Sequence, residues 1–209
     1  MTPKQVYDSI CHYVEGQNTI ICNLHSACSP FQGKSYMCTG QKSQISVIDF
    51  DSVKTKADID SGIESRKSVD AVVHSPSNTF FCFVEMKSWD LLLTHNGNEA
   101  NIRKQAKKYE SDLPKKLADS IEICKQITGD NSILDNCHIV YILITDIPVN
   151  SNLNSGISSI NSALSALAGT SSNLNVLCNQ LSRNIMNNIP KVETRYWECR
   201  SFDNEFSNL

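Results

Sequence analysis

The sequence predicts an α/β protein in which a mixed central β-sheet is flanked by helices. Short apolar runs that are typical of strands alternate with longer segments whose apolar residues recur every three or four positions, as in amphipathic helices. The chain has 209 residues, of which 40% are hydrophobic and 20% charged, enough for both a core and a polar surface. We therefore expect a single domain over residues 1–209.

A helix is expected at the N-terminus. Val6, Ile10 and Tyr13 recur at helical spacing and predict it over residues 3–15. Gly16 follows directly and is a typical stop signal.

The next stretch leads into the predicted core. Residues 19–22 are compatible with a short strand, whereas residues 23–44 are rich in Ser, Cys, Gly and Gln and predict irregular structure. Residues 45–50 alternate apolar and polar side chains and predict a strand. The N-terminal helix and the irregular cysteine-containing segment thus fill residues 1–44, and the core spans about 45–146.

A β-hairpin is the clearest local prediction. Residues 69–74 and 79–87 are β-rich runs, and the tetrad Ser75-Pro76-Ser77-Asn78 between them is typical of a turn.

A helix and a buried strand are expected after the hairpin. Asn98 can cap a helix, within which Pro114 either causes a kink or begins a second helix. The apolar residues that recur at helical spacing there are Ile102, Ala106, Tyr109, Leu113, Leu117, Ile121 and Cys124. Residues 138–145 form a nearly continuous apolar run, which predicts a central strand buried on both faces.

The last part of the chain, residues 147–209, begins with an unusual segment. Between residues 147 and 190 the only charged residue is Arg183. Leucines and isoleucines at helical spacing predict two amphipathic helices with Ser- and Asn-rich polar faces, although a low-complexity linker is an alternative. Residues 192–199 predict a final strand.

Two carboxylates and a lysine are expected to meet at one end of the hairpin. Glu85 and Lys87 lie two apart on one strand and therefore point to the same face, and Asp70 begins the neighbouring strand. Two carboxylates with open positions suit Mg²⁺, which prefers oxygen ligands. The lysine could then orient an attacking water or help to deprotonate it. The alternative is a surface ion pair with little energetic effect.

This pattern resembles the PD-(D/E)XK, or restriction-endonuclease-like, nuclease superfamily, over residues 45–146. The resemblance implies a restriction-endonuclease-like core in which Asp70 and Glu85 bind Mg²⁺ or Mn²⁺ and Lys87 assists catalysis. Gln105 and Tyr109 are similar to the Gln-x-x-x-Tyr element of the exonuclease-like branch, and would support the site. The alternative is a helix-surface role for Gln105 and a core role for Tyr109. The superfamily often adds an upstream acidic residue, and Glu15 and Glu64 are both candidates. Val69 stands where the superfamily has proline.

Net charge argues against DNA binding by bulk attraction, because the chain carries a formal charge of −3. The basic residues are nevertheless concentrated on the predicted helix after Lys87. Those expected to contact a DNA backbone are Arg103, Lys104, Lys107 and Lys108, and Lys115 and Lys116 follow them. The alternative is a solvated helix face balanced by nearby acidic residues.

The nine cysteines are expected to be mostly reduced thiols of a cytoplasmic protein. The N-terminus has no hydrophobic signal region, and no apolar run is long enough to cross a membrane. Cys22, His25, Cys28 and Cys38 are competent zinc ligands, but their spacing departs from the commonest zinc fingers, so we expect ordinary thiols and a surface histidine rather than structural Zn²⁺.

The sequence thus favours a Mg²⁺-dependent deoxyribonuclease, a phosphodiester hydrolase that acts on DNA. The family resemblance suggests bacterial restriction or anti-phage defence as its setting. The alternative is a non-catalytic, nuclease-like binding or assembly subunit that packs against a partner or forms a homodimer through residues 147–190. A third reading is a zinc-stabilised interaction module around Cys22 and Cys38.

Overall fold

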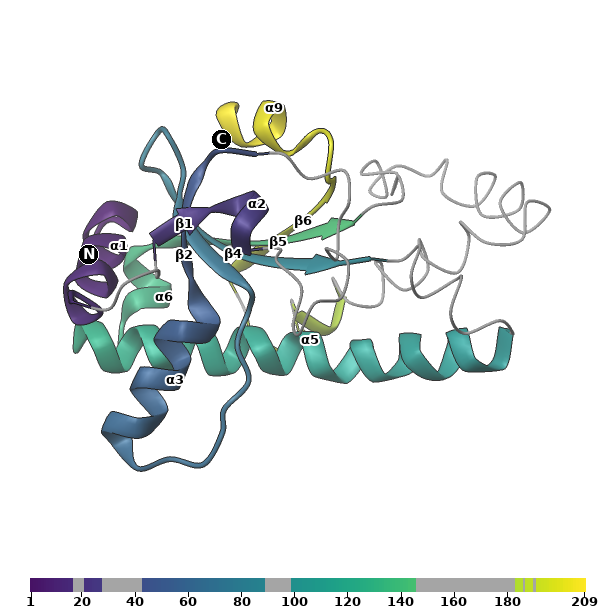
Figure 1. Cartoon of the computed structure of the whole chain (residues 1–209), viewed down its shortest axis with the longest axis horizontal. Coiled ribbons are helices and arrows are strands. Elements are labelled where there is room, and N and C mark those ends of the chain that lie inside the picture. Colours follow the sequence, from purple (N-terminus) through teal and green to yellow (C-terminus); the bar gives the residue numbers. More distant parts are fainter. Residues whose placement is uncertain (17–20, 28–42, 89–98, 146–182, 186, 190) are drawn as a thin grey trace.

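The computed structural model describes residues 1–16, 21–27, 43–88, 99–145, 183–185, 187–189 and 191–209 (Figure 1). Its helices and strands in these ranges are α1 (Pro3–Tyr13), β1 (Ile21–Asn23), α2 (Leu24–Ala27), β2 (Ser46–Asp49), α3 (Phe50–Ser61), β3 (Ala71–His74), β4 (Phe80–Lys87), α5 (Glu99–Thr128), α6 (Ile133–Asn136), β5 (His138–Thr145), β6 (Val192–Glu198) and α9 (Phe202–Ser207). The chain is an α/β protein, as predicted.

The strands form one mixed sheet of six strands in the order β1-β2-β3-β4-β5-β6. Strands β1 to β4 pair antiparallel, whereas β4, β5 and β6 pair in parallel. A parallel pair needs a crossover connection, and the long helix α5 lies in the connection between β4 and β5. This helix therefore passes back along the sheet that carries the hairpin.

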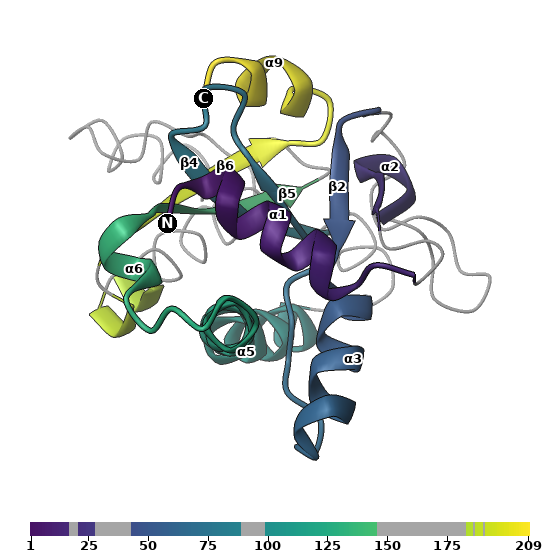
Figure 2. The same ribbon diagram turned by 90° about the vertical axis from the view of Figure 1, so that its left-hand side faces the viewer.

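Helices cover both faces of the sheet (Figure 2). Phe81 and Phe83 of β4 belong to a core shared with α1, α3 and α5, whereas Cys82 and Val84 belong to a second core shared with α9. Strand side chains alternate between faces, so the odd-numbered residues of β4 point toward α5. This alternation decides which helix the end of β4 meets.

Most predicted elements are confirmed within one or two residues. Helix α1 begins with a capping box between Thr2 and Gln5 and buries Val6 and Ile10. The hairpin is β3 and β4, the predicted central strand is β5 with the predicted bounds, and the final strand is β6. Pro114 lies inside α5, which is a single helix.

Helices α2, α3, α6 and α9 were not predicted. Asp49 caps α3 and Gly62 ends it in the left-handed conformation at φ +63°. Its apolar stripe is only Phe50, Val53 and Ala57, and the charged residues between them hide the helical period. Helix α2 begins inside residues 23–44, for which irregular structure was expected.

The other expectations concern cysteines and membranes. The free cysteines in the described residues are Cys11, Cys22, Cys82, Cys124 and Cys137, whereas Cys199 is disulfide-bonded. No helix in the described ranges is long and apolar enough to cross a membrane. Most of the uncharged segment at 147–190 lies outside the described residues.

Candidate active site

The hairpin brings Asp70 and Glu85 together. Ala71 pairs with Val84, so one further step along the antiparallel register places Asp70 opposite Glu85. The backbone N–H of Met86 donates a hydrogen bond of 2.6 Å to Oδ2 of Asp70. Asp70 is thereby held against the end of β4, and the predicted juxtaposition of the two carboxylates is present.

Lys87 points to the same face as Glu85, as its spacing predicts. Its Nζ lies 2.5 Å from Oε1 of Glu85 and donates to the carbonyl of Met86 at 3.2 Å. The same Nζ lies 5.9 Å from the ring centroid of Tyr109 on α5, within the range of a cation–π contact. Glu85 is completely buried and Lys87 nearly so.

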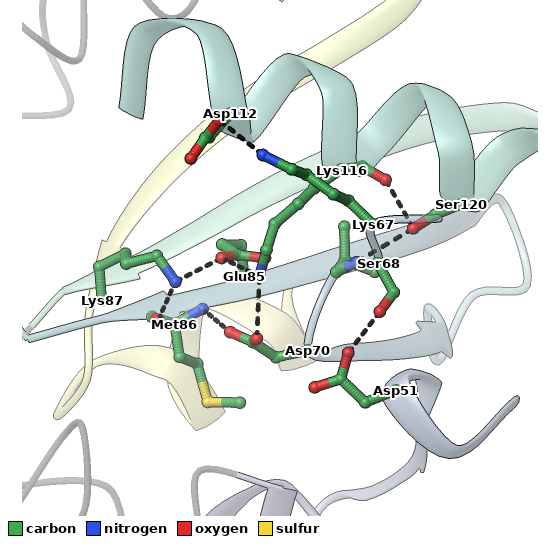
Figure 3. A network of polar contacts seen from close by, with 11 residues as sticks. Asp51, Lys67, Ser68, Asp70, Glu85, Met86, Lys87, Asp112, Lys116 and Ser120 are labelled. Atoms are coloured by element: carbon green, nitrogen blue, oxygen red, sulfur yellow. Dashed lines mark hydrogen bonds and ion pairs between the residues drawn. The ribbon is translucent and has the colours of Figure 1, made fainter. Parts of the chain in front are cut away.

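A second lysine, Lys116 of α5, reaches the cluster from the opposite side (Figure 3). Its Nζ lies 2.7 Å from Oε1 of Glu85 and 3.4 Å from Oδ1 of Asp70. Both ammonium groups therefore contact the same oxygen of Glu85. The other oxygen, Oε2, is buried and has no hydrogen-bond partner.

Helix α5 also holds the segment that leads into β3. Ser120, one turn after Lys116, accepts a 3.0 Å hydrogen bond from the backbone N–H of Val69 and donates to the carbonyl of Lys116. Asp119 accepts a 2.9 Å hydrogen bond from the backbone N–H of Lys67. These contacts fix Asp70 relative to the helix that carries Lys116.

The cluster shifts the pKa values of its members. Burial, and then the negative charge of Asp70, raise the pKa of Glu85, although Lys87 and Lys116 oppose this. Burial by itself lowers the pKa of both lysines, but the carboxylates of Glu85 and Asp70 outweigh it, so both lysine pKa values are raised. Both lysines are therefore cations at neutral pH.

A third carboxylate comes from Asp51, in the first turn of α3. Its Oδ1 accepts a hydrogen bond from the hydroxyl of Ser68. Burial of the carboxylate raises its pKa, to which the charge of Asp70 adds, while Ser68 and Lys116 oppose the shift. Asp51 is thus the acidic residue that borders the cluster and that the sequence did not indicate.

The two upstream candidates lie elsewhere. Glu15 is exposed in the turn after α1, and Glu64 is exposed in the connection between α3 and β3. The structure therefore does not bring either glutamate into the buried cluster, and Asp51 is the additional carboxylate that lies beside it.

The remaining site candidates lie on α5 or in the N-terminal segment. Tyr109 is half-buried, and Lys104 and Lys108 are exposed. The side chains of Arg103, Gln105 and Lys107 lie outside what the structure describes, as do those of His25, Cys28 and Cys38 in the zinc array. Cys22 is a half-buried free thiol.

The sequence identifies Lys116 only as one of several basic residues on the helix that follows Lys87. The helical period nevertheless indicates where Lys116 lies. It shares one face of the helix with residues that recur at spacings of four, three and four, in the series Tyr109, Leu113, Lys116 and Ser120. Leu113 and Ser120 are buried on that stripe. A lysine on the core-facing stripe of a helix needs a buried carboxylate partner, and Glu85 is that partner.

Within the described residues, no group of three or more His, Cys, Asp and Glu side chains has the arrangement of a metal site. The pair formed by Asp70 and Glu85 instead presents carboxylate oxygens alone, with Oε2 of Glu85 unsatisfied. Such hard oxygen donors fit Mg²⁺ or Mn²⁺ and do not fit Zn²⁺ or Cu²⁺ as well. Comparisons of the chain with protein-family models, curated proteins and solved structures find no match.

Proposed function

We propose that this chain is a divalent-metal-dependent nuclease that hydrolyses DNA phosphodiester bonds and has a restriction-endonuclease-like core. The observation that carries the proposal is the meeting of Asp70, Glu85 and Lys87 at one end of the hairpin, with a glutamate that is completely buried. Burying charges at a strand end is energetically expensive, so such clusters concentrate at functional sites.

Asp70 and Glu85 are the residues that would hold Mg²⁺ or Mn²⁺. The unsatisfied Oε2 of Glu85 supports this assignment, since a buried carboxylate oxygen without a partner is rare in proteins. When bound, the ion supplies positive charge that stabilises the negative charge developing on the phosphate.

Lys87 is the residue that would position the nucleophile. Its ammonium is anchored by Glu85 and by the carbonyl of Met86, which leaves it a third hydrogen to donate. That donor can hold an attacking water, or a phosphate oxygen, beside the carboxylates. The contact with the Tyr109 ring limits the directions in which the ammonium can move.

Helix α5 would provide the contacts to the DNA backbone. Lys104 and Lys108 lie one turn apart on it and are exposed, so their charges are accessible to phosphates. Arg103 and Lys107 belong to the same proposed interface, with Gln105 as a supporting residue. A role in bacterial restriction or anti-phage defence rests on the family resemblance alone.

The test is cleavage of plasmid and linear DNA in Mg²⁺ or Mn²⁺ by the wild type and by Glu85→Gln and Lys87→Met. The matched controls are Glu122→Gln and Lys125→Met, which change an exposed ion pair further along α5. We expect a loss of about 100-fold or more in the site variants. The controls should cleave at the wild-type rate, and EDTA should abolish cleavage.

Unchanged cleavage in both site variants would refute the assignment of the site. Absence of cleavage of DNA and RNA with every divalent metal would favour the alternative, a nuclease-like binding or assembly subunit acting through residues 147–190. That segment lies mostly outside the described residues.

A further inference from the structure

We propose that Lys116 is a built-in cation that occupies the metal position between Asp70 and Glu85 and must leave it when a divalent ion binds. The inference rests on the proposed function, because it concerns the same two carboxylates. It adds a residue that controls how readily the site accepts its metal.

The geometry places the Lys116 ammonium between the two proposed ligands. Its Nζ contacts Oε1 of Glu85 at 2.7 Å and Oδ1 of Asp70 at 3.4 Å, whereas Lys87 is paired with Glu85 alone of these two carboxylates (Figure 3). Asp70 directly precedes β3 and Glu85 lies on β4, and a divalent ion held by both carboxylates would compete with this shared ammonium. Lys87 lies to one side and leaves that position clear.

Charge balance favours the replacement of Lys116 by a divalent ion over the presence of both cations in the site. With both lysines in place, the carboxylates of Asp70, Glu85 and Asp51 and the two ammonium groups sum to −1, so a divalent ion would leave one uncompensated positive charge in a buried site. Without Lys116, the three carboxylates, counting Asp51, balance Lys87 and one divalent ion. Binding is therefore coupled to the departure of Lys116.

Helix α5 provides a place for the displaced ammonium. Asp112 precedes Lys116 by one helical turn and lies on the same face. Asp112 already pairs with Lys67 at 2.6 Å, and this hydrogen bond lowers its pKa most, against the opposing effect of burial. The charges of Lys67, Lys108 and, least of all, Lys116 lower the pKa further. Lys116 is also partly exposed, so a change of side-chain rotamer can carry its charge toward Asp112 and solvent.

The first experiment measures Mn²⁺ affinity directly, by electron paramagnetic resonance of the free ion during titration of the 209-residue chain without DNA. Lys116→Met is compared with Lys115→Met, the neighbouring lysine, which pairs with Asp119 on the exposed surface. We expect Lys116→Met to bind Mn²⁺ about tenfold more tightly than wild type. Lys115→Met should match wild type, and Glu85→Gln should bind weakly or not at all.

The outcomes separate the two proposals. Equal affinity of wild type and Lys116→Met, or weaker binding by Lys116→Met, overturns the role of Lys116 but leaves the metal site in place. No Mn²⁺ binding by either protein overturns the proposed metal site itself.

A second experiment uses only the wild-type protein, so that it does not depend on how the variants fold. An amine-acylating reagent is applied with and without saturating Mg²⁺, and the labelled lysines are quantified by mass spectrometry. Acylation of Lys116 should rise at least fivefold when Mg²⁺ is present, while that of Lys115 stays constant. Constant labelling of Lys116 under conditions where Mn²⁺ binding is observed would overturn the inference.

Discussion

The ion pair between Glu85 and Lys116 connects the end of β4 to helix α5, and a double-mutant cycle measures its strength. The four proteins are the wild type, Glu85→Gln, Lys116→Met and the double variant. Each single change removes a buried charge that is expensive to desolvate but also leaves a partner charge without its counterion. Because these effects oppose each other, the coupling energy is more informative than either single value.

The magnitude follows from the geometry. At the 2.7 Å between Nζ of Lys116 and Oε1 of Glu85, Coulomb's law with an effective dielectric constant of about 20 gives roughly 6 kcal/mol of gross attraction. Lys87 contacts the same oxygen at 2.5 Å and takes over part of this interaction when Lys116 is removed. Hydrogen bonds to charged groups contribute about 1.5–3 kcal/mol net, so we expect a coupling of about 2 kcal/mol.

The assay is urea denaturation of all four proteins in metal-free buffer at pH 7, with the free energy of unfolding taken by linear extrapolation. A control cycle uses Glu122→Gln and Lys125→Met, whose charges are 3.3 Å apart at the surface. Exposed helical pairs couple by no more than about 0.5 kcal/mol. A Glu85–Lys116 coupling as small as that of the control pair would refute a buried ion-paired cluster.

Three further predictions concern the supports of the site and of α3. Asp58→Asn should lower the free energy of unfolding by about 1.5–3 kcal/mol at pH 7, because Arg66 bonds to Asp58 at 2.6 Å. Although burial alone raises the pKa of Asp58, its bonds to Arg66 lower it overall, so this stabilisation is present above pH 4 and is lost at lower pH. Urea denaturation at pH 7 and pH 3 tests the sign, and an equal difference at both would contradict it. Ser120→Ala should cost about 1–3 kcal/mol in chemical denaturation, because it leaves the buried N–H of Val69 unpaired, whereas no measurable loss would show that this bond is dispensable. Gly62→Ala should cost about 1 kcal/mol from backbone strain alone, since its φ is +63° and an added Cβ meets nothing within 4 Å. An unchanged melting temperature would contradict this last prediction.

Local periodicity explains which parts of the fold were predictable. Short apolar runs joined by a turn tetrad predict the hairpin, and a further apolar run predicts β5. The structure confirms both. Helix α3 was missed because its apolar stripe is narrow and most of its other positions are polar or charged. Packing against α5 and the sheet stabilises it instead. The apolar periodicity of residues 50–61 was therefore too weak to predict α3.

The sequence by itself determined the side of the sheet that Glu85 and Lys87 share, because residues two apart on a strand cannot point to opposite faces. The hairpin turn determined that Asp70 lies beside them, since the antiparallel register follows from the turn.

Only the tertiary structure decided that Lys116 and Asp51 border this cluster. They lie on different helices, and their positions depend on how α3 and α5 pack across one face of the sheet (Figure 2). Such packing results from long-range burial of apolar surface, which no window of neighbouring residues encodes. The strand that carries Glu85 and Lys87 was therefore readable from local sequence. The helical period places Lys116 on the core-facing side of α5, but only the packing of α5 shows that Glu85 and Asp70 are its partners.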